Sequence, residues 1–171
     1  MKHEALQLYD YHVWANNKFF GRLKELPQEI YDQKMQSVFP SIADVLAHIF
    51  VTDTIYLSVI RGDNMDDTQA AITETQQKIK GTGLGEMEAL FHDLEEQYQT
   101  FFNTVGDMEQ PITVEHPHFG KLDTRLCEMV QHVVNHGTYH RGNLTAMIRQ
   151  QGSPSVPTDY IMYLYEKQAT N

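Results

Sequence analysis

Apolar side chains recur every three or four residues along most of this chain of 171 residues. That spacing is the period of an α-helix, and the strict alternation of a half-buried β-strand is almost absent. Four stretches carry such a stripe and are each long enough for a bundle helix: residues 3–25, 41–62, 86–105 and 123–150. The pattern predicts an all-α fold, a four-helix bundle, and the length suits a single domain over residues 1–171.

The ends of the predicted helices carry the expected boundary residues. Pro27 follows the first helix, Ser41 with Asp44 forms a capping-box-like pair at the start of the second, and Gly62 ends it. The polar stretch 63–85 predicts a long crossover connection, with a helical turn around residues 67–79. A crossover of this length permits a topology in which consecutive bundle helices are not antiparallel neighbours.

Two shorter elements are predicted outside the bundle. Residues 111–123 contain β-branched and aromatic residues around turn-forming ones, which predicts a small hairpin before the fourth helix. The segment that begins at Pro157 predicts a short C-terminal helix capped by Thr158 or Asp159, with its tyrosines packed on the bundle.

The charge and cysteine content narrow the class of protein. Thirteen basic and twenty-three acidic residues give a formal net charge of −10, and no basic stripe is present, so we expect no nucleic-acid partner. The single cysteine, Cys127, excludes an internal disulfide and fits a reducing compartment. The N-terminus does not have the pattern of a signal peptide, and no uninterrupted apolar run reaches the length of a membrane span. We expect a cytoplasmic protein with no membrane partner.

Three histidines, His132, His136 and His140, are spaced four residues apart in the fourth predicted helix. At roughly 100° per residue, His140 lies within about 40° of His136, on the seam that also carries Met129 and Met147. Two imidazoles one turn apart can hold one metal ion. His132 falls about 40° to the other side, which predicts a residue at the rim or behind the ligands. The alternative is that these histidines are hydrogen-bonded core residues.

A labile divalent metal needs a third protein ligand. The remaining histidines are the candidates: His3, His12, His48, His92, His116 and His118. Only His48 shares a helix face with apolar residues, namely Ile55 and Val59, so we expect it to point into the bundle. His12 flanks the first stripe and His92 adjoins acidic residues, and we expect both to be exposed. His116 and His118 lie in the predicted hairpin turn, where exposure is also expected.

Three segments resemble a known family: residues 11–17 (YHVWANN), 41–50 (SIADVLAHIF) and 136–144 (HGTYHRGNL). The last is the most specific, an H-x-x-x-H-R-G-Q type of motif, and the three together anchor most of the chain. The sequence resembles the DinB superfamily of small metalloenzymes, DNA-damage-inducible helical bundles that are unrelated to the polymerase of that name. The resemblance implies a four-helix bundle with a crossover, often a homodimer, that binds a divalent metal through three histidines. Carried over residue by residue, these are His48, His136 and His140.

Several polar residues near these motifs need an explanation. Asn143 replaces the family's more usual glutamine but keeps the amide. Arg141 projects about 140° from His136, which predicts an ion pair or a helix-packing contact and not a ligand. Gly142 is expected to permit close approach of a neighbouring segment. Asn16 lies on the first apolar stripe, where it either orients a ligand histidine or bridges two helices. Cys127 lies about 180° from His136 and is not expected at the metal.

Three neutral imidazoles leave an ion its charge and an open coordination position, as in catalytic metal sites. Characterised members of the resembled superfamily include transferases that use bacillithiol or mycothiol. The resemblance therefore favours a transferase in which the metal activates a low-molecular-weight thiol for attack on a small electrophilic substrate. The runner-up enzyme is a hydrolase in which the metal activates water, and a third alternative is a metal-binding bundle without turnover. Zinc or nickel is the preferred metal, with iron, cobalt or manganese as alternatives. The catalytic and thiol-binding residues are not assigned by the sequence.

Overall fold

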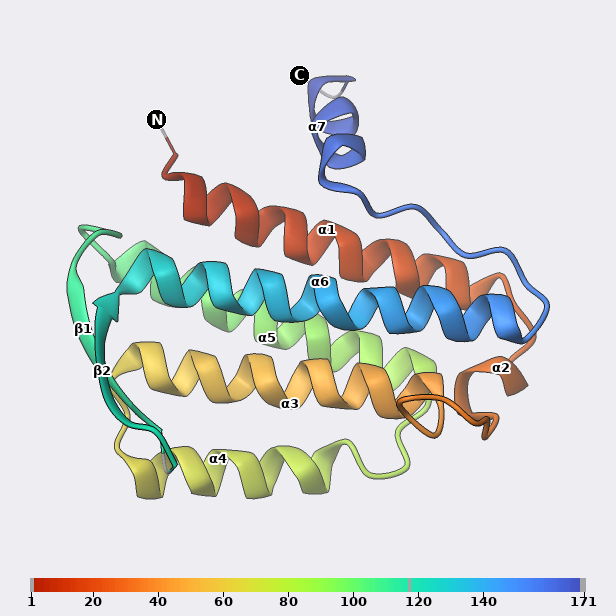
Figure 1. Cartoon of the computed structure of the whole chain (residues 1–171), viewed down its shortest axis with the longest axis horizontal. Helices are drawn as coiled ribbons and strands as arrows, with labels where there is room; N and C mark the ends of the chain where they lie inside the picture. The colour runs from red at the N-terminus through yellow and green to blue at the C-terminus, as the bar shows by residue number, and fades with distance from the viewer. Residues whose placement is uncertain (1, 117, 170–171) are drawn as a thin grey trace.

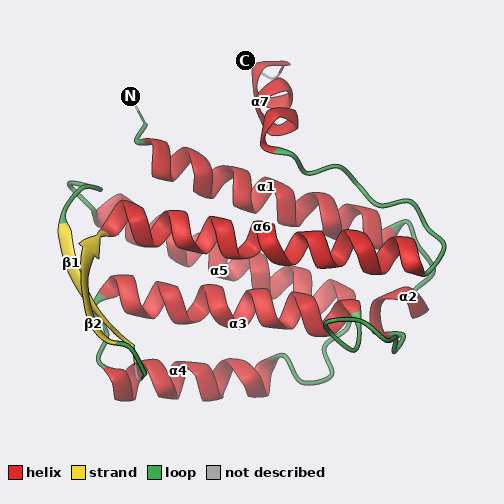
Figure 2. Ribbon diagram, in the orientation of Figure 1, coloured by secondary structure: helices red, strands yellow, loops and turns green. Residues whose placement is uncertain are grey.

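The computed structural model describes residues 2–116 and 118–169, which form an elongated helical bundle (Figures 1 and 2). Four long helices make up its body: α1 (Glu4–Lys24), α3 (Ile42–Arg61), α5 (Leu84–Thr104) and α6 (Leu126–Gln150). Three shorter helices and one hairpin complete the described part of the chain. The predicted all-α bundle is therefore confirmed.

The four long helices enclose one apolar core. Helices α1 and α3 each pack against both α5 and α6. In Figure 1, α1 and α6 run in one direction, and α3 and α5 run in the other. Phe20, Phe50 and Phe91 pack together from three of these helices. The bundle thus places α3 antiparallel to α6, which is the pair that carries the histidine motifs.

The second predicted helix has the ends that its sequence indicates. The hydroxyl oxygen of Ser41 accepts a hydrogen bond from the backbone N–H of Asp44 at 3.2 Å. Gly62 ends α3 in the left-handed conformation, with φ of 83°, a conformation that costs glycine little because it has no Cβ. Among the described residues, α3 alone has the length and hydropathy of a membrane span, and much of it is buried in the bundle.

The crossover between α3 and α5 contains a full helix, α4 (Met65–Lys78), where the sequence predicted only a turn. Asn64 caps this helix by accepting a hydrogen bond from the N–H of Asp67 at 2.9 Å. Helix α4 packs on α3 at the side of the bundle (Figure 1). The crossover lets α3 and α5 run parallel to each other, as the length of the 63–85 segment permits.

The predicted hairpin is confirmed and lies at one end of the bundle (Figure 2). Strand β1 (Pro111–His116) pairs antiparallel with β2 (Gly120–Arg125). Helix α6 therefore begins at Leu126, not at residue 123, because residues 123–125 pair with β1. A four-residue helix at the other end, α2 (Glu29–Asp32), was not predicted.

The short C-terminal helix is also confirmed, as α7 (Tyr160–Ala169). Asp159 precedes it, and its carbonyl accepts a hydrogen bond from the N–H of Met162 at 2.9 Å. Tyr163 is buried against Tyr11 and Trp14 of α1. Aromatic packing thus holds α7 on the outer face of α1, where Figure 1 shows it projecting from the bundle.

Candidate metal centre

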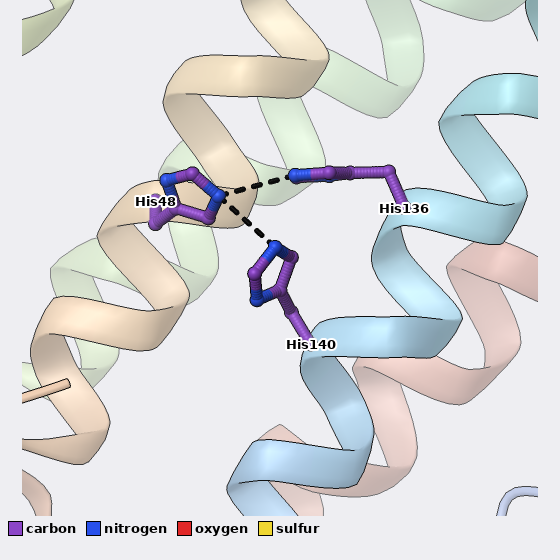
Figure 3. Close-up of side chains that lie close together, drawn as sticks. All are labelled: His48, His136 and His140. Atoms are coloured by element: carbon purple, nitrogen blue, oxygen red, sulfur yellow. Dashed lines mark hydrogen bonds between the residues drawn. The ribbon is translucent and has the colours of Figure 1, made fainter. Parts of the chain in front are cut away.

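Helices α3 and α6 bring His48, His136 and His140 together (Figure 3). The Nε2 atom of His48 lies 3.1 Å from Nε2 of His136 and 3.1 Å from Nε2 of His140. One nitrogen from each ring lies within 4.8 Å of the other two. We call these three residues the histidine triad. The sequence singled out the same three, and among the described residues no other cluster of histidine, cysteine or acidic groups is arranged to hold a metal.

The donor set fits a divalent transition metal. Two nitrogens bound at about 2.1 Å to one tetrahedral ion lie roughly 3.4 Å apart, close to the spacing seen here. Burial, with the charges of His140 and His48 next, lowers the pKa of His136 to about 3. Burial also lowers the pKa of His48 and of His140. All three rings are therefore neutral at pH 7 and offer lone pairs, which is the form that binds a metal.

Aromatic side chains flank the histidine triad. The ring of Phe39 lies 5.2 Å from that of His48 and 5.4 Å from that of His140, measured between centroids. Tyr139 packs edge-on against His140 and is largely exposed. Phe39 is itself half-buried and shields one side of the triad, while His48 and His136 remain partly accessible. The triad is thus covered on one side and reachable from solvent.

His132 lies at the rim, as its angle on the helix predicted. Its ring stacks on that of His136 at 6.3 Å and packs against Tyr56 at 4.5 Å. It does not belong to the triad cluster. Burial of its ring lowers its pKa. His132 and Tyr56 therefore form an edge of the site and not part of its ligand set.

The amide of Asn143 is the one hydrogen-bonding group that contacts the far nitrogen of a triad ring in the described residues. Its Nδ2 position lies 3.2 Å from Nδ1 of His140. The resemblance placed Asn143 where the family more often has glutamine and did not assign it a role. Its spacing of three residues from His140, on the same helix face, was the signal for this contact.

A second set of polar residues lies behind the triad and is fully buried, and we call it the buried network. Its members are His12, Asn16, Asp53 and Arg141. The expectation that His12 is exposed is wrong: its exposed fraction is 1%. His12 Nε2 lies 2.9 Å from a carboxylate oxygen of Asp53, and the Arg141 guanidinium lies 3.2 Å from His12 Nδ1.

The buried network is a chain in which one imidazole joins a cation to an anion. Arg141 can only donate, so Nδ1 of His12 accepts and its Nε2–H donates to Asp53. Arg141 also donates to the amide oxygen of Asn16 at 2.9 Å. Arg141 is therefore a helix-packing residue, as predicted, and Asn16 bridges α1 to α6. The arrangement compensates two buried charges that would otherwise be costly.

Gly137 makes room for the side chains of the buried network. A Cβ at residue 137 would overlap the His12 ring and also meet the Arg141 side chain. Gly142, which the sequence suggested as the point of close approach, has open space at the corresponding position, so that expectation is wrong. The two glycines lie on different faces of α6, and only the face toward α1 is crowded.

The other histidines and Cys127 lie away from the triad cluster. His92 is exposed beside Glu95 and Glu96, as predicted. His3 caps α1 through Nδ1, which accepts a hydrogen bond from the N–H of Ala5. His116 and His118 are exposed in the hairpin. Cys127 is buried and is not part of the cluster, as its position on α6 predicted.

Comparison with known proteins agrees with this architecture. The model of the DinB family matches residues 1–170. The chain belongs to the DinB family. It is also 45% identical over 161 residues to Protein DinB of Bacillus subtilis (strain 168), and the match covers 94% of each chain. The family segments of the sequence lie in α1, α3 and α6, and the triad draws its three side chains from the last two.

Proposed function

We propose that this protein is a divalent-metal enzyme that transfers a low-molecular-weight thiol, of the bacillithiol kind, to an electrophilic carbon of a small substrate. The observation that carries the proposal is the meeting of three neutral imidazole Nε2 atoms at a partly accessible site. Membership of the DinB family supports it. Zinc or nickel suits three imidazoles best, and iron, cobalt and manganese are alternatives.

In this proposal His48, His136 and His140 hold the ion. A bound divalent metal lowers the pKa of a thiol that coordinates it, so the thiolate is present at neutral pH. Phe39 shields one side of the triad from water. The accessible side of the triad is bordered by Tyr139, Tyr56 and His132. In this position they would contact the thiol or its electrophilic partner. Because Cys127 lies outside the cluster, the nucleophile arrives with the thiol.

A hydrolase that activates water at the same metal is the second candidate, but it needs a carboxylate as general base. Asp53 is the buried carboxylate nearest to the triad in sequence. One of its oxygens is already bonded to His12, inside the bundle. That engagement favours the thiol reaction. A metal-binding bundle without turnover is the remaining alternative. We further propose a cytoplasmic homodimer that acts on small molecules and has no nucleic-acid or membrane partner.

The test is metal content of the purified, untagged protein by plasma mass spectrometry, beside His136→Ala. The cobalt-substituted protein is then titrated with a low-molecular-weight thiol. Near-stoichiometric metal that is lost in the variant, with a thiolate charge-transfer band on adding thiol, supports the transferase. Metal without a thiolate band overturns the thiol reaction and leaves the hydrolase or the non-catalytic bundle. No metal in either protein would make the triad histidines ordinary core residues.

A further inference from the structure

Histidine ligands in metal sites usually donate their second ring N–H to a carboxylate, carbonyl or amide, which fixes the ring and makes it a better ligand. In the histidine triad, Nδ1 of His140 lies 3.2 Å from Nδ2 of Asn143, and turning this amide over brings its oxygen to the same place as an acceptor. Nδ1 of His136 is buried and has no hydrogen-bond partner among the described residues. When Nε2 of His136 binds a metal, its proton resides on Nδ1, and a buried donor without an acceptor is costly. His136 therefore needs an acceptor.

Asp53 has a buried acceptor oxygen that lacks a donor. One carboxylate oxygen, Oδ2, accepts from His12 at 2.9 Å. The other, Oδ1, is buried and has no hydrogen-bond partner in the described part of the chain. Asp53 as a whole is 3% exposed. The interior next to the triad thus holds one unsatisfied acceptor on α3 and one ring nitrogen on α6 that becomes an unsatisfied donor on metal binding.

The helices place these two groups at the same level of the bundle. Asp53 follows His48 by five residues, or about 7.5 Å along α3. Because α3 is antiparallel to α6, this displacement leads toward the N-terminal end of α6 (Figure 1). Side chains lean toward the N-terminus of their own helix, so in this antiparallel pair the His136 ring leans toward the level of Asp53 and the Asp53 carboxylate leans back toward that of His136.

The contacts of His12 support this placement. Its ring is bonded to Asp53 on one side and lies against Gly137, the neighbour of His136, on the other. The His12 ring thus spans the space between the Asp53 carboxylate of α3 and the backbone of α6 next to His136.

We propose that Asp53 is a positioning residue for the metal centre, whose Oδ1 accepts the Nδ1–H of His136 when the metal occupies Nε2. The inference rests on the proposed metal binding. One carboxylate then accepts hydrogen bonds from two histidines, His12 and His136. Arg141 lies at the other end of this row of hydrogen-bonded side chains. The buried network is in this way the support that holds a ligand ring in its binding orientation.

A water molecule is the rival partner for Asp53. A cavity of about 20 Å³ lies beside Asp53, His12 and Asn16, and that volume holds about one water. Water there would satisfy Oδ1 of Asp53. It would leave Nδ1 of His136 without a partner, because His136 does not line that cavity.

Asp53→Asn tests the proposal, because the amide replaces one of the two carboxylate oxygens with an NH2 donor, so the side chain no longer offers an acceptor on each side. The matched control is Tyr98→Phe, which removes the 2.7 Å bond from the Tyr98 hydroxyl to the backbone carbonyl of Asp53 and leaves the carboxylate. Zinc affinity is measured by chelator competition. We expect about 10- to 100-fold weaker binding in Asp53→Asn and little change in Tyr98→Phe. Equal affinity in the two variants overturns the proposal.

The NMR signals of the imidazole N–H protons in the zinc-loaded protein give a second readout, which does not depend on the stability of the variant. In the wild type, the proton on Nδ1 of His136 should resonate at low field and exchange slowly. In Asp53→Asn it should shift or vanish while the His140 proton stays. If the variant does not fold, the wild-type spectrum decides: a rapidly exchanging His136 proton beside a protected His140 proton overturns the proposal. A wild type that binds no zinc overturns metal binding itself, whereas unchanged affinity in Asp53→Asn overturns only the role of Asp53.

Discussion

The histidine triad and the buried network are neighbouring polar regions built around the same residue type, yet they leave their histidines in opposite situations. In the triad, the three Nε2 atoms face one another, and the hydrogen-bonding groups that they contact among the described residues are each other's rings. In the buried network, His12 lies between an arginine and a carboxylate, so both ring nitrogens are engaged. The difference teaches that the polar partners of a histidine decide its role: imidazoles whose Nε2 atoms face only one another can bind a metal, and an imidazole with a polar partner on each ring nitrogen is a structural link.

Among the substitutions that would test this comparison, the largest loss of stability is expected in the buried network. Arg141→Met keeps the volume but leaves the Asp53 carboxylate buried without a cation. We expect the metal-free protein to lose about 3–5 kcal/mol of unfolding free energy, the usual result of removing one partner of a buried pair. Urea denaturation measures it. A loss below about 1 kcal/mol, as for a surface pair, would mean that solvent already reaches the network.

The next effect concerns the triad. His48→Ala or His140→Ala should weaken metal binding by at least about 100-fold, because two imidazoles hold a divalent ion poorly. The helices should be retained in circular dichroism spectra. His132→Ala is the matched control from the rim and should keep most of the metal. Equal losses from all three variants would contradict the ligand assignment.

A smaller effect is expected at the glycine between the two regions. Gly137→Ala places a methyl group in the His12 ring and should destabilise the protein by about 1–3 kcal/mol, the usual result of overpacking. Gly142→Ala, on the same helix with open space at its Cβ, should gain up to about 1 kcal/mol from helix propensity. Thermal denaturation of the pair checks the sign. Two stabilised variants would show that His12 moves away without a penalty.

The smallest effect is a dependence of stability on pH. The pKa of His136 is about 3 in the folded protein, and near 6.5 when unfolded. Between these two pH values the unfolded chain binds more protons than the folded protein. The unfolding free energy is therefore unaffected by His136 above about pH 6.5 and decreases as the pH falls below it. Metal-free protein should lose more unfolding free energy between pH 7 and pH 5 than His136→Ala does. Equal losses would contradict the lowered pKa.

The sequence predicts much of this molecule because its strongest signals are local. The apolar period marks the four long helices, Ser41 and Gly62 mark the ends of α3, and the seam of α6 selects His136 and His140. The sequence suggests that His12 is exposed because a helical projection contains no information about the other helices that pack on it. Its burial depends on Gly137, on a helix far along the chain.

The same limit explains what was missed around the site. Asp53 is a charged residue in an apolar helix, and only its contacts with His12 show that it is buried and bonded. Helix α4 is polar and packs mainly on α3, so its apolar stripe is weak and the sequence suggested only a turn. Tertiary partners, which local periodicity cannot supply, decide both cases.

The triad joins residues that are distant in sequence: His48 and His136 are 88 positions apart. An ion bound between them would act as a reversible cross-link that closes a long loop of the chain. Because the unfolded chain cannot present this site, bound metal would add stability as RT ln(1 + [M]/Kd), or about 2.7 kcal/mol at a hundred times the Kd. The amount of folded protein in a cell would then follow its supply of free metal, independently of any reaction at the site.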